Sequence, residues 1–111
     1  MPTPFMHIAL AARLIDDPEL PSSAYEMLKQ AWGAFLLGSI APDARVASGL
    51  ARSATHFFDY TSPPNVPPAC KLLSAFPMLR CSALTDSAQR AFVAGYAAHL
   101  AMDAVLSLIH I

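Results

Sequence analysis

Ten prolines divide this 111-residue chain into short segments, and most of these segments carry the apolar spacing of a helix. Proline fixes its own backbone and disfavours a helical conformation in the residue before it, so helices end near prolines. The alternation of apolar and polar residues that is typical of strands does not occur in the sequence. The pattern therefore predicts an all-α fold, a multi-helix bundle whose joints are rich in proline.

The expected elements follow from these breaks and from capping residues. In chain order they are a helix over 5–15, a helix from Ser22 or Ser23 to about Gly38, a turn over 40–43, a short or irregular helix within 44–58, a loop over 59–68, a helix from Pro68 that breaks near Pro77, and a helix from Asp86 to at least Ala104 with Thr85 as its N-cap.

The chain is 55% hydrophobic and 14% charged, which argues against disorder and raises the question of a membrane span. The candidate span is 91–109, but His99 and Asp103 near its middle make a lipid-facing helix costly. We therefore expect a buried helix and no transmembrane segment. The first residues lack a basic stretch followed by an apolar one, which predicts no secretory signal and a cytoplasmic location. Cys70 and Cys81 are expected to be small core residues.

Seven basic and eight acidic residues give a net charge of −1. A chain without a cationic field is poorly suited to bind nucleic acid through its phosphates. The scarcity of charge also makes the position of each ionisable residue informative.

His99 and Asp103 are four residues apart in the last expected helix, so both lie on one face among apolar residues. A buried imidazole and a buried carboxylate each need a partner. One interpretation is a mutual ion pair inside a bundle, and the other is a metal site, because both groups at this spacing can reach one cation.

Three further residues bear on this choice. His7 lies in an apolar helix, Asp43 follows Pro42 in a turn, and His56 precedes two phenylalanines. Each residue by itself has a structural explanation, as an exposed histidine, a helix cap or a core histidine. Together with His99 and Asp103 they supply three imidazoles and two carboxylates, a set of ligands that suits Zn²⁺.

In this order and spacing the motifs resemble the zinc-dependent phospholipase C family, which shares its fold with the S1/P1-type nucleases. The most specific pieces are Gly38-Ser39-Ile40-Ala41-Pro42-Asp43, the His-Phe-Phe-Asp of residues 56–59, and a helix that carries Gly95-Tyr96 followed by His99 and Asp103. The resemblance spans His7 to Asp103. It implies an all-helical, P1 nuclease-like fold and the hydrolysis of phosphodiesters at a cluster of up to three zinc ions.

The resemblance also implies roles for individual residues. Asp43, His56 and His99 would be ligands of one zinc ion, and Asp103 would bridge this ion to a second one held partly by His7. Asp43 would in addition orient the attacking water. The implied substrate is a phosphodiester such as a phospholipid, and the nuclease relatives keep nucleic acid open as a substrate. The sequence indicates no oligomeric state.

This chain departs from the family pattern at both ends. It begins with Met1-Pro2, where the resemblance implies a tryptophan ligand, and its tryptophan, Trp32, lies mid-helix. The family's further ligands after Asp103 do not occur. We therefore expect residues 1–105 to be the N-terminal part of a truncated domain that is inactive by itself. Residues 106–111 match the translation of a sequencing-library adapter, and we expect an adapter-derived tail there.

Two alternatives use the same composition. An HD-type phosphohydrolase is also helical, but it needs adjacent histidine and aspartate residues, which this sequence lacks. A non-catalytic helical module, structural or membrane-associated, needs no metal and also explains the apolar composition. Metal content distinguishes it from a phosphodiesterase.

Overall fold

The computed structural model describes residues 4–57, 66–80 and 86–109, and this part of the chain contains helices and no strand. The elements are α1 (Pro4–Leu14), α2 (Ser22–Gln30), α3 (Trp32–Ile40), the 3₁₀ helix η1 (Ala41–Ala44), α4 (Arg45–Ser48), α5 (Arg52–His56), α6 (Pro68–Ala75), the 3₁₀ helix η2 (Pro77–Leu79) and α7 (Ser87–Ile109). The predicted all-α fold is confirmed.

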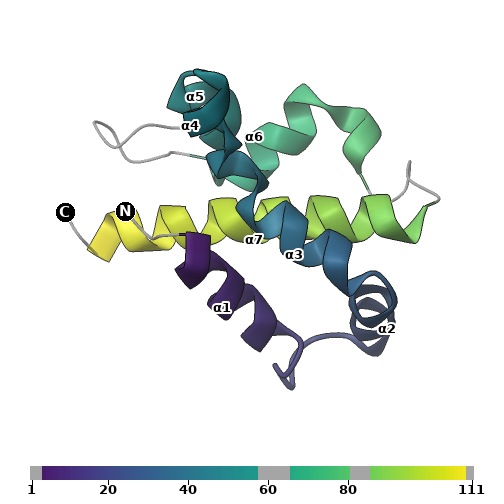
Figure 1. Ribbon diagram of the computed structural model, residues 1–111. Coiled ribbons are helices and arrows are strands. Elements are labelled where there is room, and N and C mark those ends of the chain that lie inside the picture. The colour runs from purple at the N-terminus through teal and green to yellow at the C-terminus, as the bar shows by residue number, and fades with distance from the viewer. Residues whose placement is uncertain (1–3, 58–65, 81–85, 110–111) are drawn as a thin grey trace.

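The long helix α7 is the axis of the molecule (Figure 1). Helix α3 crosses it and makes the most extensive contact with it, while α1, α2 and α6 each pack against α7 as well. In Figure 1, α1 and α2 lie on one side of α7, and α4, α5 and α6 lie on the other. Segments from both ends of the sequence therefore meet along α7.

The crossing of α3 and α7 depends on two glycines. A Cβ atom on Gly38 would lie 2.0 Å from the carbonyl oxygen of Phe92, and one on Gly95 would lie 2.1 Å from that of Phe35. Two helix backbones can approach this closely only where side chains are missing. The crossing brings the last turn of α3 against the middle of α7.

An apolar core stabilises the same crossing. It contains Ala11 from α1, Leu28 from α2, Phe35 from α3 and Ala91 from α7, all at most 2% exposed, with Trp32 packed against them. Burying an aromatic or aliphatic side chain contributes about 1.5–3 kcal/mol, so this cluster fixes α1 and α3 on α7.

The structure differs from the sequence prediction in two of its elements. The helix expected from Ser22 to Gly38 is broken at Ala31, whose φ of −119° and ψ of 43° are not helical. The break lets α2 and α3 take different directions while Leu28 and Phe35 both reach the core. The turn expected over 40–43 is the 3₁₀ helix η1.

Of the other predictions, some are met, some lie outside the described residues, and the one for Cys70 is wrong. Helices α1 and α7 confirm two of the expected spans, and the Asp86 carboxylate caps α7 by accepting from the backbone N–H of Ala88 at 2.8 Å. The predicted cap Thr85, Cys81 and most of the loop over 59–68 lie outside the described residues. Cys70 is exposed on α6, so its expected place in the core is wrong.

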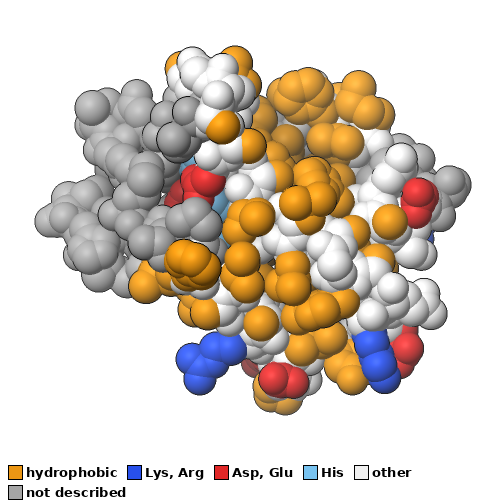
Figure 2. Space-filling view, viewed as in Figure 1, with side chains coloured by type: hydrophobic (Ala, Val, Ile, Leu, Met, Phe, Trp, Pro, Cys, Tyr) orange, Lys and Arg blue, Asp and Glu red, His pale blue; other side chains and the backbone are white. Residues whose placement is uncertain are grey.

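Hydrophobic side chains also cover much of the face shown in Figure 2. Leu37, Met78 and Val105 are among the large apolar residues that are more than half exposed. The high apolar fraction of the sequence is therefore not consumed by the core alone. No helix in the described part is long and apolar enough to cross a membrane.

Candidate metal centre

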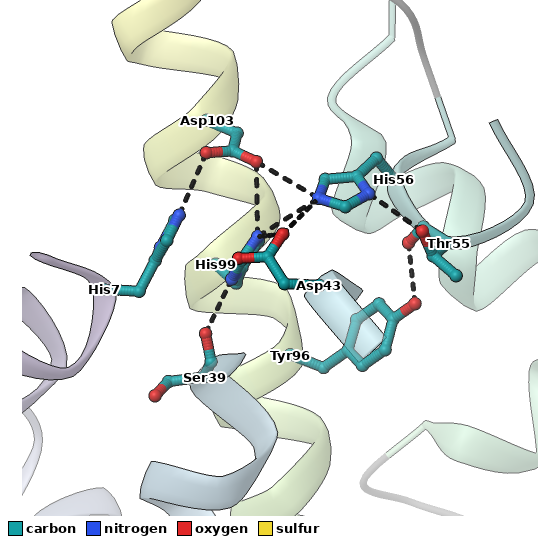
Figure 3. A network of polar contacts seen from close by, with 8 residues as sticks. All are labelled: His7, Ser39, Asp43, Thr55, His56, Tyr96, His99 and Asp103. Carbon is teal, nitrogen blue, oxygen red and sulfur yellow. Dashed lines mark hydrogen bonds and ion pairs between the residues drawn. The ribbon is translucent and has the colours of Figure 1, made fainter. Parts of the chain in front are cut away.

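The five residues that the sequence singled out come together in one buried cluster beside α7 (Figure 3). His7 comes from α1, Asp43 from η1 and His56 from α5, while His99 and Asp103 come from successive turns of α7. His7, His56, His99 and Asp103 are at most 1% exposed, and 19% of the Asp43 side chain is exposed. The cluster therefore opens to solvent at Asp43.

Two imidazoles and one carboxylate form the first part of the cluster. His56 Nε2 lies 3.2 Å from His99 Nε2 and 3.2 Å from Asp43 Oδ1, and His99 Nε2 lies 3.5 Å from the same oxygen. Around a tetrahedral zinc ion with ligands at about 2.0–2.1 Å, neighbouring donor atoms are about 3.3–3.4 Å apart. The triangle has the dimensions of one face of such a site.

Asp103 forms a second triangle with the same two imidazole nitrogens, Nε2 of His56 and Nε2 of His99. Its Oδ2 lies 3.4 Å from His56 Nε2 and 3.2 Å from His99 Nε2. Its Oδ1 lies 3.0 Å from Nε2 of His7, on the other side of the carboxylate. The two oxygens of Asp103 thus face two separate groups of donors, as a bridging ligand requires.

His99 is oriented by a backbone carbonyl. Its Nδ1 lies 2.6 Å from the carbonyl oxygen of Ser39, and because a carbonyl only accepts, Nδ1 carries the hydrogen and donates it. In the neutral ring Nε2 then holds a lone pair, and this lone pair faces His56, Asp43 and Asp103. Metal-binding histidines typically donate their second nitrogen in this way.

The end of α3 explains why the Ser39 carbonyl is available. The last carbonyls of a helix lack intrahelical partners, and in a 3₁₀ continuation the residue three positions later would supply the donor. For Ser39 that residue is Pro42, which has no N–H. Because Pro42 cannot donate to it, the carbonyl of Ser39 is open to Nδ1 of His99, while the Ser39 hydroxyl separately donates to the Leu36 carbonyl at 2.6 Å.

The electrostatics of the cluster favour an ionised Asp103. Burial by itself would raise the pKa of this carboxyl, but in the metal-free chain hydrogen bonding to His7 and His99, and attraction to these rings in their protonated form, outweigh burial. The pKa of Asp103 is therefore held well below its usual range. A carboxylate ready in its charged form is the state in which Asp binds a metal ion.

His7 adds an unsatisfied buried atom. Its ring stacks on that of His99, with centroids 3.5 Å apart and planes inclined by 9°. Its Nδ1 is buried and has no hydrogen-bond partner among the described residues. Two groups of donors can therefore hold a metal ion, namely His7, His99 and Asp103, and Asp43, His56 and His99. The residues present fit zinc.

No role was predicted from the sequence for the residues that surround these donors, although Ser39 and Tyr96 belong to the quoted motifs. Thr55 places its Oγ1 2.8 Å from Nδ1 of His56, and the Tyr96 hydroxyl donates to the Thr55 carbonyl at 2.6 Å (Figure 3). Burial raises the pKa of the Tyr96 phenol. Two features of the sequence could have indicated the role of the Ser39 carbonyl, namely Pro42 three residues later and the glycines at 38 and 95. A backbone acceptor has no side-chain pattern of its own, however, so this role was not predicted.

An all-α fold with a buried cluster of histidine and aspartate side chains is typical of helical metalloproteins. The model of one such family, described as zinc dependent phospholipase C, matches residues 6–111. The chain therefore belongs to the zinc-dependent phospholipase C family. No curated protein and no solved structure matches the chain, so the more detailed P1 nuclease-like fold stays a prediction.

Proposed function

We propose that this chain supplies zinc ligands of a phospholipase C-like phosphodiester hydrolase. Asp43, His56 and His99 hold one zinc ion in this proposal, and Asp103 bridges it to a second ion held partly by His7. The observation that carries it is the pair of triangles that Asp43 and Asp103 form with the two imidazole nitrogens, with sides of 3.2–3.5 Å. A single ion pair between a histidine and an aspartate explains one of these distances. It does not explain why five such distances involve the same two imidazole nitrogens.

Zinc bound at this position supplies a Lewis acid for the phosphoryl oxygens and lowers the pKa of a bound water. The residues of the chain hold and orient the reacting groups. Asp43, the exposed member of the cluster, can accept a hydrogen bond from an entering water and orient it. The buried His99 and Asp103 cannot make that contact without displacing the helix that carries them.

A cavity of about 310 Å³ supports a substrate with an apolar part. It is lined almost entirely by apolar residues, including Leu72 and Phe92, and it begins at Phe57 and Tyr96 beside the cluster. Cavities of this size and character bind small apolar groups. We therefore propose a phospholipid as the substrate rather than a nucleic acid, which the net charge of −1 disfavours.

Metal content tests the proposal directly. We expect the chain, refolded with zinc and then dialysed, to retain at least about one ion per chain by elemental analysis. His56→Ala and His99→Ala should each lower this content, because each removes a donor from the first site. His110→Ala is the matched control, since it removes a histidine that the proposal assigns to neither ion. Equal zinc content in all four chains would contradict the proposal.

Activity is a separate question. That residues 1–111 alone are inactive stays a prediction, and so does the adapter origin of 106–111, which the underlying codons would test. We expect a chain extended with its native downstream sequence to hydrolyse phosphatidylcholine faster than a water-soluble diester without acyl chains. Faster cleavage of single-stranded nucleic acid would instead favour the nuclease branch, and no cleavage of any diester would favour the structural module.

A further inference from the structure

Tyr96 connects α7, which carries His99 and Asp103, to α5, which carries His56. It lies three residues before His99 and seven before Asp103, which places all three on one side of α7. Its hydroxyl does not face the metal donors but donates at 2.6 Å to the carbonyl of Thr55, 41 residues earlier in the chain. Helix α7, which supplies His99 and Asp103, is thus also hydrogen-bonded to helix α5, which supplies His56.

Thr55 passes this contact on to His56. Its carbonyl accepts from Tyr96, while its Oγ1 lies 2.8 Å from Nδ1 of the His56 ring. The backbone of Thr55 and the ring of His56 are therefore both fixed by short hydrogen bonds. On the far side of this ring, Nε2 lies 3.2 Å from His99 Nε2 and 3.2 Å from Asp43 Oδ1.

Helix α5 requires such an external contact because it has only five residues, Arg52–His56. A helix of this length is not stable by itself, and its last carbonyls lack intrahelical partners. Directly after His56 the chain turns away, because Phe57 adopts a φ of 63°, a conformation that is unfavourable for an aromatic residue. Its own helix therefore does little to hold His56 in place, and the contact from α7 supplies that restraint.

We propose that Tyr96 is a positioning residue, which acts through Thr55 to hold the His56 ring at the distance from His99 and Asp43 that a metal ion needs. This inference rests on the proposed metal-binding function, but it concerns a residue that does not touch the ion. It predicts that the Tyr96 hydroxyl, which donates to the Thr55 carbonyl and not to a donor residue, sets the affinity of the metal site.

The test titrates the metal-free chain with Co²⁺, whose visible absorption reports the ligand geometry. Tyr96→Phe should bind Co²⁺ roughly tenfold more weakly and show altered visible bands, as is typical when a partner of a metal ligand is lost. Tyr25→Phe is the matched control, because Tyr25 is exposed on α2 and remote from the cluster, and it should bind like the wild type. Equal affinity in both variants and the wild type would overturn the inference.

A second comparison separates positioning from general loss of stability. Leu28→Ala on α2 loosens the apolar core that packs against α7 and changes none of the donor residues, so it should lower the melting temperature but leave the Co²⁺ affinity unchanged. A loss as large as that of Tyr96→Phe would show that any loosening of α7 weakens the site, which would overturn the inference. Thr55→Val should bind several-fold more weakly and Thr55→Ser, which keeps the hydroxyl, should not.

The two proposals fail in different ways. If the wild-type chain binds no Co²⁺, the metal-binding function fails and the inference fails with it. If the wild type binds and Tyr96→Phe binds equally well, the function stands and the inference alone is overturned.

Discussion

Gly38 and Gly95 touch where α3 crosses α7: a Cβ atom built on Gly95 would lie 3.1 Å from the carbonyl carbon of Gly38. One residue further along α3 is Ser39, and one turn further along α7 is His99. Nδ1 of the His99 ring lies 2.6 Å from the carbonyl oxygen of Ser39. The spacing of the two backbones at the glycines therefore determines whether the His99 ring reaches the carbonyl that orients it.

Replacing Gly95 should disrupt both the fold and the metal centre. In Gly95→Ala the new methyl group meets the Phe35 carbonyl at 2.1 Å, so the helices must separate. We expect the free energy of unfolding to fall by about 1–3 kcal/mol and zinc retention to fall with it. Urea denaturation and elemental analysis measure the two effects.

The control for this change is Gly33→Ala on α3, where a Cβ meets no other atom within 4 Å. Alanine favours a helix over glycine, so this variant should gain about 0.5–1 kcal/mol and keep its zinc. A Gly95→Ala chain as stable as Gly33→Ala would show that the helices can separate freely.

The ionisation of Asp103 should make the metal-free chain sensitive to acid. Because the pKa of Asp103 is lowered in the folded state, its contribution to stability is complete above the unfolded value of about 3.9. This contribution is lost as the pH falls below that value, where the unfolded chain takes up a proton first. Urea midpoints measured from neutral to acidic pH should therefore fall less steeply in Asp103→Asn than in the wild type.

Asp16→Asn serves as the control for Asp103, since Asp16 is exposed after α1. It should reproduce the wild-type acid profile. If the urea midpoint falls equally steeply with pH in Asp103→Asn and in the wild type, the contacts with histidine do not lower the pKa of the Asp103 carboxyl.

The Tyr96 phenol should act at the opposite end of the pH scale. Burial raises its pKa in the folded state, so above the unfolded value of about 10 the unfolded chain loses a proton that the folded chain keeps. Stability therefore decreases as the pH rises through this interval. Tyr96→Phe should lack that decrease and also lack a phenolate that the wild type forms above the ordinary tyrosine range in an ultraviolet titration. A titration unchanged by the substitution would contradict the assignment.

Removing His7 should affect the second ion and spare the first. His7 faces Oδ1 of Asp103, while the donors of the first site surround Oδ2. We expect His7→Ala to retain about one zinc ion fewer per chain than the wild type when zinc is in excess. His110→Ala should match the wild type, and complete loss of zinc from His7→Ala would show that the two groups of donors form a single site.

The sequence predicted the donors better than the path of the helices. All five donor residues stood out because charge is scarce in this chain, and the structure brings them together, although their role as ligands stays a prediction. The break at Ala31 was missed because no proline or glycine occupies it; tertiary packing of Leu28 and Phe35 outweighs the local helix propensity. The roles of Tyr96 and Thr55 were not predicted because their contact joins residues 41 positions apart through a backbone carbonyl.

The contact between His7 and Asp103 spans 96 positions, which is nearly the whole chain. A ribosome that has made α1, η1 and α5 has made three of the donors and still lacks the helix that gathers them. The cluster can therefore form only after α7 has been synthesised. Its formation then costs the conformational entropy of closing a long loop between His7 and Asp103. Under the proposed function, metal loading is therefore a late event in the biogenesis of this protein. Chains released before residue 99 is made would carry His7, Asp43 and His56 without the two donors of α7 and would not retain an ion.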